Sequence, residues 1–321
     1  MTIYNIRSSG GDYTSLQDAE DDLSNPTVQH TFNVTEAFDA GPLVVDFPDS
    51  SAVGLLITVD DAIWPPADWG TAAVEGAAAR CVKGSGGNVI YLVNDDITVE
   101  RLVVTGANYA VRIDGSNAIV RDLNLHDSPI GAIYGASTGT GNLVYRVAAW
   151  YSGYCGSVAG GSIDFYHVTQ FAPYYWGFRR TSGTVNCYGC AVFDTGSSRD
   201  DYTGTIGGDQ NMSSDANAKG TNPWTNITSS DVLENVTGGS EDLHLKSSVD
   251  GSYECDDRSG TIGSTDCGGD TVTDWDVGAF EYIAAGGGVI KTVNGLAFAS
   301  VKTVQGLAIA SVKTINGVAT A

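Results

Sequence analysis

The feature that most constrains the fold is a loose repeat of 21 to 24 residues between residues 87 and 198. Five β-prone segments share one apolar pattern, and they begin at Val99, Val120, Val144, Phe165 and Cys187, in steps of 21, 24, 21 and 22 residues. Loops rich in Gly, Ser, Asn and Thr separate them. Such a period is typical of a β-solenoid, in which each turn stacks on the last. We therefore expect one inward column made by Leu102, Leu123, Val147, Val168 and Cys190.

Helix signals are confined to the N-terminus. Residues 12–24 carry an apolar face and acidic early turns, and Thr14 is placed to cap the helix with Gln17 three residues later. Residues 72–79 are a weak second candidate. The chain holds 41 Gly and only 8 Pro among its 321 residues, and Tyr, Thr, Ser and Val are common. This composition favours an all-β protein with many turns.

Both ends of this region resemble a known superfamily. Residues 11–19, Gly-Asp-Tyr-Thr-Ser-Leu-Gln-Asp-Ala, look like the N-terminal cap of pectate-lyase-like right-handed parallel β-helix proteins. Residues 241–247 and 276–282 resemble the C-terminal end of bacterial and phage members. The resemblance implies an all-β, right-handed parallel β-helix with a capping helix. We expect the cap over residues 1–30 and the β-helix body over residues 31–285.

A second repeat, with a period of 11 residues, covers residues 290–321 of a C-terminal tail (286–321) that begins with a hinge of three glycines. Each unit has two β-prone runs around an Asn-Gly or Gln-Gly pair, which is a hairpin signal, and is too small to bury its own apolar residues. The tail resembles C-terminal extensions of bacteriophage structural proteins, so we expect an assembly module that docks on copies of itself or on a larger particle. Its expected assembly residues are Lys291, Val293, Leu296, Phe298, Lys302, Val304, Leu307, Ile309, Lys313 and Ile315.

The formal net charge of −22 restricts the partners. Phosphate contacts need Lys and Arg, so we expect no nucleic-acid partner. The sequence shows neither a signal-peptide pattern at its start nor a run of about 18 apolar residues, so we expect no membrane insertion. Six cysteines are too few for a disulfide scaffold at this length. Cys255 and Cys267 flank a polar loop, and their pairing is left open.

Charged residues recur at one position of successive repeats. If the protein is an enzyme, the catalytic candidates are Asp122, His167, Asp164 and Arg146, because glycoside hydrolases need two carboxylates and lyases need a base. The interpretation we favour is a surface stripe of alternating charges that stabilises stacking modestly. The paired aspartates of polygalacturonase-type hydrolases and the arginine motif of pectate lyases are both absent.

Aromatic residues form a second group. The candidates for glycan or partner binding are Trp150, Tyr151, Tyr174, Tyr175 and Trp176, because exposed rings stack on sugars and anchor partners. Trp150 and Phe171 occupy equivalent positions of successive repeats. Packing inside the solenoid or between subunits is therefore the interpretation we favour for this group.

No metal site is expected. The Cys-x-x-Cys pair at Cys187 and Cys190 lacks a second pair or histidines at zinc-binding spacing, so two buried small side chains are favoured. Acidic groups such as Asn94-Asp-Asp96 leave room for Ca²⁺, although no known calcium motif occurs. We expect no cofactor.

Two functional classes follow. The favoured one is a non-enzymatic bacteriophage virion surface protein, such as a fibre, spike or capsid decoration, which assembles or attaches through its C-terminal repeats and binds a host-surface glycan. The alternative is a polysaccharide depolymerase, a lyase or glycoside hydrolase, of a phage tailspike or a secreted extracellular bacterial enzyme. By analogy with β-helix spikes we expect a homotrimer that contacts other virion proteins. The fold alone does not decide between the classes.

Overall fold

The computed structural model describes two compact units, Met1–Glu281 and Tyr282–Ala321. In the first unit the described residues are 2–23, 28–47, 54–60, 71, 79–83, 86–106, 108–136, 138–195, 199–249, 252–255, 261 and 275–279. In the second unit they are six two-residue strands between Thr292 and Ala319.

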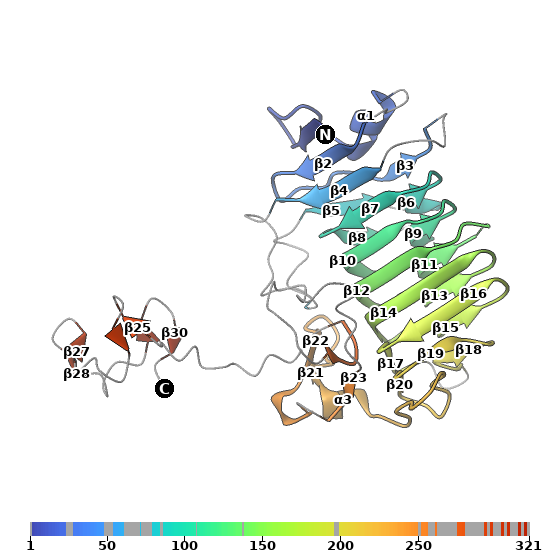
Figure 1. The fold of residues 1–321 in the computed structure, drawn as a ribbon, viewed down its shortest axis with the longest axis vertical. Helices are drawn as coiled ribbons and strands as arrows, with labels where there is room; N and C mark the ends of the chain where they lie inside the picture. Colours follow the sequence, from blue (N-terminus) through green and yellow to red (C-terminus); the bar gives the residue numbers. More distant parts are fainter. Residues whose placement is uncertain are drawn as a thin grey trace. The chain divides into compact units, whose positions relative to one another are not determined.

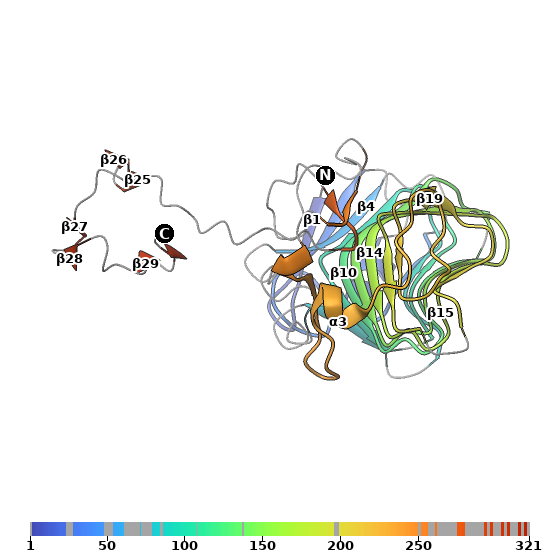
Figure 2. The same cartoon turned by 90° about the horizontal axis from the view of Figure 1, so that it is seen from below.

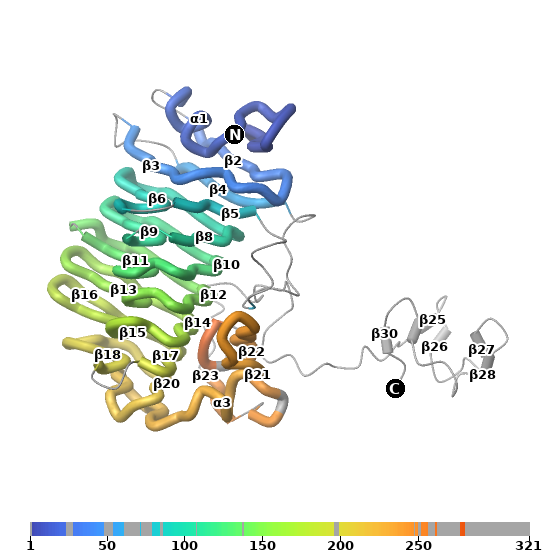
Figure 3. Tube along the Cα trace, turned by 180° about the vertical axis from the view of Figure 1, so that it is seen from behind, coloured from blue at the N-terminus to red at the C-terminus, as the bar shows by residue number. Residues whose placement is uncertain are grey.

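The first unit is a parallel β-solenoid with three strand faces per turn (Figures 1 and 3). Sheet A has two arms. The first arm runs β1 (Thr2–Ile6), β2 (His30–Val34), β4 (Leu55–Val59), β7 (Ile97–Glu100), β10 (Ile119–His126), β12 (Asn142–Trp150), β14 (Ser162–Phe171), β16 (Thr184–Tyr188) and β19 (Gly207–Asp209). The second arm runs β5 (Arg80–Lys83), β8 (Val103–Gly106), the C-terminal halves of β10, β12 and β14, then β17 (Ala191–Phe193) and β20 (Met212–Ser213).

Sheet B forms the third face. Its order is β3 (Leu43–Val45), β6 (Asn88–Leu92), β9 (Tyr109–Ile113), β11 (Gly131–Gly135), β13 (Tyr154–Val158), β15 (Trp176–Arg180) and β18 (Tyr202–Thr203). Seen from below, successive turns superpose around a common interior (Figure 2).

The register confirms the predicted repeat. Val99 pairs with Val120, Val120 with Val144, Val144 with Phe165, and Phe165 with Cys187. The expected inward column is fully buried along its whole length, from Leu102 to Cys190. The all-β parallel solenoid expected from the sequence is therefore present.

Two columns of left-handed residues turn the chain at its corners. The first, called the corner column here, separates the two arms of sheet A and consists of Arg101, Asp122, Arg146, His167, Gly189 and Gln210, with φ between 48° and 61°. The second follows the second arm and consists of Gly106, Asp127, Tyr151, Ala172 and Asp194. Non-glycine residues seldom adopt this conformation, because Cβ approaches the backbone. Its recurrence at the repeat spacing shows that the stacking of turns imposes it.

At the N-terminus, helix α1 (Leu16–Asp21) buries Leu16, Ala19 and Glu20. Its N-cap is Ser15, whose hydroxyl accepts a hydrogen bond from the backbone N–H of Asp18 at 3.0 Å, and not Thr14 as predicted. β1 is the first strand of sheet A. The backbone carbonyl of Asn5 in β1 accepts a hydrogen bond from the Asp12 N–H, which satisfies part of its unpaired edge. Most of the second helix candidate, residues 72–78, lies outside the described residues.

The last segments of the body comprise α3 (Ser229–Val232), β21 (Leu233–Asn235), β22 (Asp242–Leu245), the 3-10 helix η2 (Ser247–Val249), β23 (Glu254–Cys255) and β24 (Trp275–Asp276). They contact the second arm of sheet A. Gly278 N–H donates to the Gly189 carbonyl at 2.6 Å, Ala279 N–H donates to Thr169 Oγ1 at 2.8 Å, and Tyr151 Oη donates to Glu241 Oε1. These segments therefore cover the outer side of that arm.

The second unit holds three antiparallel strand pairs. They are β25 (Thr292–Val293) with β26 (Leu296–Ala297), β27 (Thr303–Val304) with β28 (Leu307–Ala308), and β29 (Thr314–Ile315) with β30 (Val318–Ala319). In each pair two residues, Asn-Gly or Gln-Gly in the sequence, separate the strands. Among the expected assembly residues, those outside the described residues are Lys291, Phe298, Lys302, Ile309 and Lys313.

No helix of the described residues is long and apolar enough to cross a membrane.

Candidate functional site: the outer face of sheet B

The predicted catalytic residues of the corner column are buried. Arg146 Nη2 lies 2.8 Å from Asp122 Oδ2, Arg146 Nε lies 2.8 Å from Asp122 Oδ1, and the two residues are only 6% and 5% exposed. Burial raises the pKa of the Asp122 carboxyl, and the Arg146 guanidinium acts in the opposite direction. In this pair the N–H edge of the guanidinium faces the two oxygens of the carboxylate, and the Nη2–Oδ2 contact is a charge-assisted hydrogen bond. Asp122 and Arg146 therefore stabilise each other's charge inside the fold and are not exposed to a ligand.

Of the other two catalytic candidates, His167 is fully buried and Asp164 is half-buried. The His167 ring and Cys255 Sγ pack closely against Gly189, because a Cβ added at Gly189 would lie 2.9 Å from each of them. Asp164 lies on the first arm of sheet A and accepts a hydrogen bond from Asn186 Nδ2 at 2.8 Å. Cys267 lies outside the described residues, so the pairing of Cys255 stays a question.

Sheet B differs from the rest of this acidic chain in its charge. None of its seven strands contains Asp or Glu, although the chain has 38 acidic and 16 basic residues. The same strands carry Arg112, Arg179 and Arg180. Val111, Ile133 and Phe178 of these strands are buried in the interior, whereas the rings and guanidinium groups beside them are half-buried.

Aromatic rings and arginines stack along this face. The residues, called the sheet B surface here, are Tyr91, Tyr109, Arg112, Tyr134, Tyr154, Tyr175, Trp176, Arg179 and Arg199. Tyr109 and Tyr134 stack at 4.5 Å between ring centroids, and Tyr154 and Trp176 stack at 5.5 Å.

Two guanidinium groups flank Trp176. Arg179 lies 4.8 Å from the centroid of the Trp176 ring, and Arg199 lies 4.5 Å from it. Arg179 Nη1 also donates to Tyr154 Oη at 3.1 Å. Stacking on a ring attracts a cation without neutralising it and leaves its N–H edge free to donate. Trp176 therefore holds two cations in fixed positions.

The arginines of this surface differ in their partners. Arg112 lies over the Tyr91 ring at 4.5 Å and forms an ion pair with Asp114 at 2.8 Å, and this carboxylate raises the pKa of Arg112. Within the part of the chain that the structure describes, no ion pair involves Arg179 or Arg199. The positive charge near Trp176 is thus uncompensated by a direct contact.

The predicted aromatic group is divided by the structure. Trp150 is 2% exposed and stacks on His126 at 5.3 Å, so its ring is not available to a ligand. The Tyr151 hydroxyl is bound to Glu241. Tyr174 and Tyr175 are 53% and 39% exposed, and Trp176 lies in the stack beside them. Only the last three lie at or beside the sheet B surface.

Sequence reasoning missed most of this surface. It did not select the following as binding residues: Tyr91, Tyr109, Arg112, Tyr134, Arg179 and Arg199. A usable signal was present, because Tyr109, Gly131, Tyr154 and Trp176 follow one another at the repeat spacing. The absence of acidic residues from every third β-prone run was a second signal.

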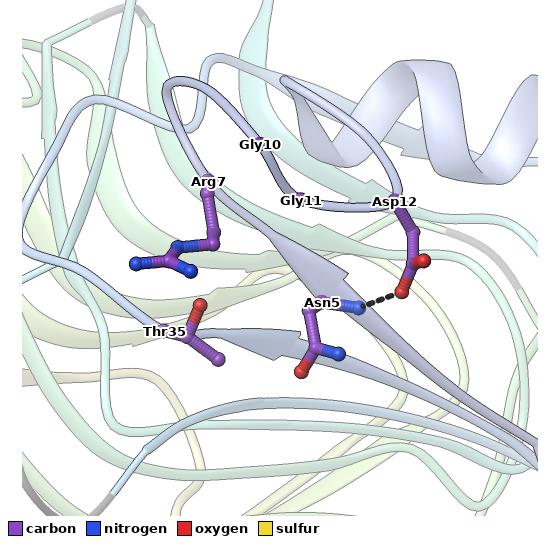
Figure 4. Close-up of a pocket in the computed structure, with 6 residues that line it drawn as sticks. All are labelled: Asn5, Arg7, Gly10, Gly11, Asp12 and Thr35. Atoms are coloured by element: carbon purple, nitrogen blue, oxygen red, sulfur yellow. Dashed lines mark hydrogen bonds between the residues drawn. The ribbon is translucent and has the colours of Figure 1, made fainter.

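A polar pocket of about 390 Å³ lies at the N-terminal end, lined by Asn5, Arg7, Gly10, Gly11, Asp12 and Thr35 (Figure 4). Asp12 Oδ2 accepts a hydrogen bond from the Asn5 backbone N–H at 2.7 Å. The one cation, Arg7, is 3.9 Å from Glu36. The pocket has no aromatic lining and its charges have partners, so it is a weaker candidate than the sheet B surface.

Metal ligation finds no support in the described residues, in which no group of three or more His, Cys, Asp or Glu side chains is arranged to hold an ion. Cys187 and Cys190 are fully buried, and burial raises the pKa of the Cys187 thiol.

Comparisons with known proteins add little. No protein-family model and no curated protein matches the chain. A search of solved structures finds the crystal structure of pectate lyase Pel9A, with a TM-score of 0.42, 13% sequence identity, and coverage of 88% of this chain and 96% of that chain.

Proposed function

We propose that this protein is a non-enzymatic surface protein of a bacteriophage virion, whose solenoid binds an anionic host-surface glycan through the sheet B surface. The observation that carries the glycan part is the pair of stacked arginines at Trp176 on a sheet without acidic residues. In a chain of net charge −22, such a face is the place where a polyanion meets the least repulsion.

The geometry favours a carboxylate or sulfate ligand. Guanidinium groups recognise such anions through paired N–H donors, and charge-assisted hydrogen bonds are stronger than neutral ones. Arg179 and Arg199 are already ordered by their contacts with Trp176. Less side-chain entropy is lost when an ordered group binds, so this arrangement is preorganised.

The spacing favours an extended polymer over a small molecule. In the register of sheet B, Arg112 on β9 and Arg179 on β15 lie in one column, with one residue of β11 and one of β13 between them. Neighbouring strands lie about 4.8 Å apart, so the two arginines are roughly 14 Å apart along the solenoid. A chain with repeated charges can contact both.

The positions of the carboxylates favour glycan binding over glycan cleavage. Glycoside hydrolases hold two carboxyl groups on either side of the scissile bond, within about 10 Å of each other. The strands of sheet B provide none, and Asp122 is committed to Arg146. The depolymerase alternative is kept as an outcome of the test below.

The tail supports the assembly part of the proposal. Its strand pairs recur every 11 residues, and two-stranded hairpins are marginally stable alone. Pairing with further copies of the repeat, in a homotrimer or with another virion protein, would satisfy their free edges. A location on the virion surface, with an extracellular location as the alternative, follows from this reasoning.

Glycan binding is tested with dextran sulfate and alginate, and with neutral dextran as the control ligand. Arg179→Ala should weaken binding of the charged polymers by about tenfold, the effect of losing one charge-assisted hydrogen bond. The matched control is Arg121→Ala on the first arm, where the guanidinium is bound to Glu100. Equal affinity of wild type and Arg179→Ala, or equal binding of neutral dextran, would contradict the proposal. New unsaturated uronates or reducing ends in the alginate would show that the protein is an enzyme.

The assembly role is tested separately. Removal of residues 286–321 should lower the molecular mass in solution from that of an oligomer to that of a monomer, as measured by light scattering. An unchanged number of subunits would show that the tail does not drive self-assembly, whatever the glycan result.

A further inference from the structure

The last turn of the solenoid contains two aspartates that share one hydroxyl group. Ser213 Oγ lies 2.7 Å from Asp201 Oδ2 and 2.6 Å from Asp215 Oδ1. A serine hydroxyl has one proton to donate and two lone pairs to accept with. Asp215 N–H donates to this Ser213 oxygen at 3.1 Å, which occupies one lone pair.

One additional proton completes this arrangement. If both carboxyl groups are ionised, the hydroxyl donates to one of them and faces the other with a lone pair. If the pair of carboxyls retains a proton, Asp201 donates to Ser213, Ser213 donates to Asp215, and each atom has a partner. Asp201 is fully buried, and its Oδ2 also accepts hydrogen bonds from the Ser214 N–H at 2.7 Å and from Ser214 Oγ at 2.9 Å. These hydrogen bonds lower the pKa of Asp201, but burial and the nearby Asp215 charge outweigh them and raise it to about 6.

The charged groups around Asp201 agree with this. Asp215 faces it from the end of β20, and Asp200 is joined to Asp215 through Asn217, whose amide donates to both carboxylates. On its own segment Tyr202 is buried, and its pKa is raised by burial. Among the ion pairs of the described residues none involves Asp201, since the neighbouring Arg199 lies over the Trp176 ring.

Asp201 also fixes the segment that carries Arg199. Its N–H donates to Asp215 Oδ2 at 3.0 Å, and its carbonyl accepts from Phe178 N–H at 2.9 Å. Tyr202 and Thr203 then pair with Phe178 and Arg179 in register. The backbone that positions Arg199 is therefore tied to the aspartate pair on one side and to β15 on the other.

We propose that Asp201 is a positioning residue for the sheet B surface: the proton it shares with Asp215 holds residues 199–203 in place, so that an anionic glycan binds more tightly at mildly acidic than at alkaline pH. This inference rests on the proposed glycan binding for its effect on affinity, but not for the titration of Asp201. Loss of the proton places two like charges on one hydroxyl and loosens the segment that holds Arg199 against Trp176.

The titration is tested first, without a ligand. The carboxyl ¹³C resonance of Asp201 should titrate near the value expected from its burial, about two pH units above an ordinary aspartate, and Trp176 fluorescence should change over the same range. Asp201→Asn should abolish the fluorescence change, and the matched variant Asp200→Asn on the exposed neighbour should keep it. A carboxyl that titrates at the ordinary value would overturn the inference, and this measurement needs only the wild-type protein.

The effect on binding is tested second, with dextran sulfate as the probe because its sulfates stay ionised. The affinity of wild type and of Asp200→Asn should fall about fivefold from about pH 5 to about pH 8, a modest coupling between two sites. Asp201→Asn should bind with no such fall. If dextran sulfate binds but the fall persists in Asp201→Asn, the inference is wrong and the proposed function stands. If dextran sulfate does not bind at any pH while Asp201 titrates as expected, the proposed glycan binding fails instead. Binding that requires added Ca²⁺ would show that a cation, and not a proton, joins the two aspartates, and would overturn the inference.

Discussion

The corner column and the sheet B surface both place arginines at the repeat spacing of the solenoid, yet the surroundings of those arginines differ. In the corner column Arg146 is buried and bound on two atoms by Asp122. On the sheet B surface Arg179 is half-buried and stacks on Trp176, and no carboxylate of the described residues pairs with it. The same residue type stabilises the fold in one place and leaves a charge available to a ligand in the other.

The difference arises from backbone conformation. Residues of the corner column have positive φ and lie at the bend between the two arms of sheet A, where Asp122, Arg146 and His167 are buried. The rings and arginines of sheet B flank extended strands, and neighbouring turns stack them on one another. A position within the turn, and not the residue type, decides which charges are structural.

The largest effect is expected from breaking the buried pair. Asp122→Ala removes the carboxylate that faces the buried Arg146 guanidinium, and breaking a buried pair in this way costs about 3–5 kcal/mol of the free energy of unfolding. Urea denaturation measures this cost. The double variant Asp122→Leu with Arg146→Met should recover much of the loss, because no charge remains. A loss below about 1 kcal/mol for Asp122→Ala would show that the pair behaves as an exposed one.

A pair of tryptophan variants sharpens the comparison. Trp150→Ala removes a buried ring and should lower the free energy of unfolding by about 3 kcal/mol while binding of dextran sulfate stays unchanged. Trp176→Ala should do the opposite, with a smaller loss of stability and weaker binding, because it releases Arg179 and Arg199. Thermal unfolding and binding are measured on both variants. Loss of dextran sulfate binding in Trp150→Ala but not in Trp176→Ala would show that the ligand does not bind the sheet B surface.

A smaller effect comes from Glu20, a buried carboxyl that forms no ion pair with any described residue. Burial raises its pKa from 4.5 to about 7. The folded state therefore holds the proton more tightly than the unfolded state, so this group's contribution to stability falls as pH rises from about 4.5 to about 7, by roughly 1–3 kcal/mol. Urea denaturation at about pH 5 and about pH 8 should show this fall in wild type, and Glu20→Gln should reduce it. An unchanged pH dependence in Glu20→Gln would exclude Glu20 as its cause.

Sequence reasoning reached the solenoid because its repeat is local. The register of Val99, Val120, Val144, Phe165 and Cys187, and the inward column beside them, follow from spacing alone. The charged position next to that column was interpreted as a surface stripe. At Gly189 the corner column is contacted from nearly 90 positions away in the chain, because the Gly278 N–H donates to the Gly189 carbonyl. No pattern within one repeat contains that information.

Sequence reasoning missed most of the sheet B surface for a related reason. Tyr154 and Trp176 are 22 positions apart, and Arg199 follows after a further 23, so their stack exists only once the turns are superposed. Adjacent aromatics drew attention to residues 150–151 and 174–176, and of these only Tyr175 and Trp176 belong to the sheet B surface. Trp150 is directed by the second arm of sheet A to a buried position, where it stacks on His126.

The most direct test of the central claim is arginine footprinting with phenylglyoxal, read by mass spectrometry with and without dextran sulfate. We expect Arg179 and Arg199 to react in the free protein and to be protected by the polymer. Arg146 should stay unreactive in both states, and Arg7 and Arg121, which lie away from sheet B in ion pairs with glutamates, should react equally in both. Protection of Arg7 or Arg121 without protection of Arg179 and Arg199 would show that the anionic ligand binds elsewhere on this protein.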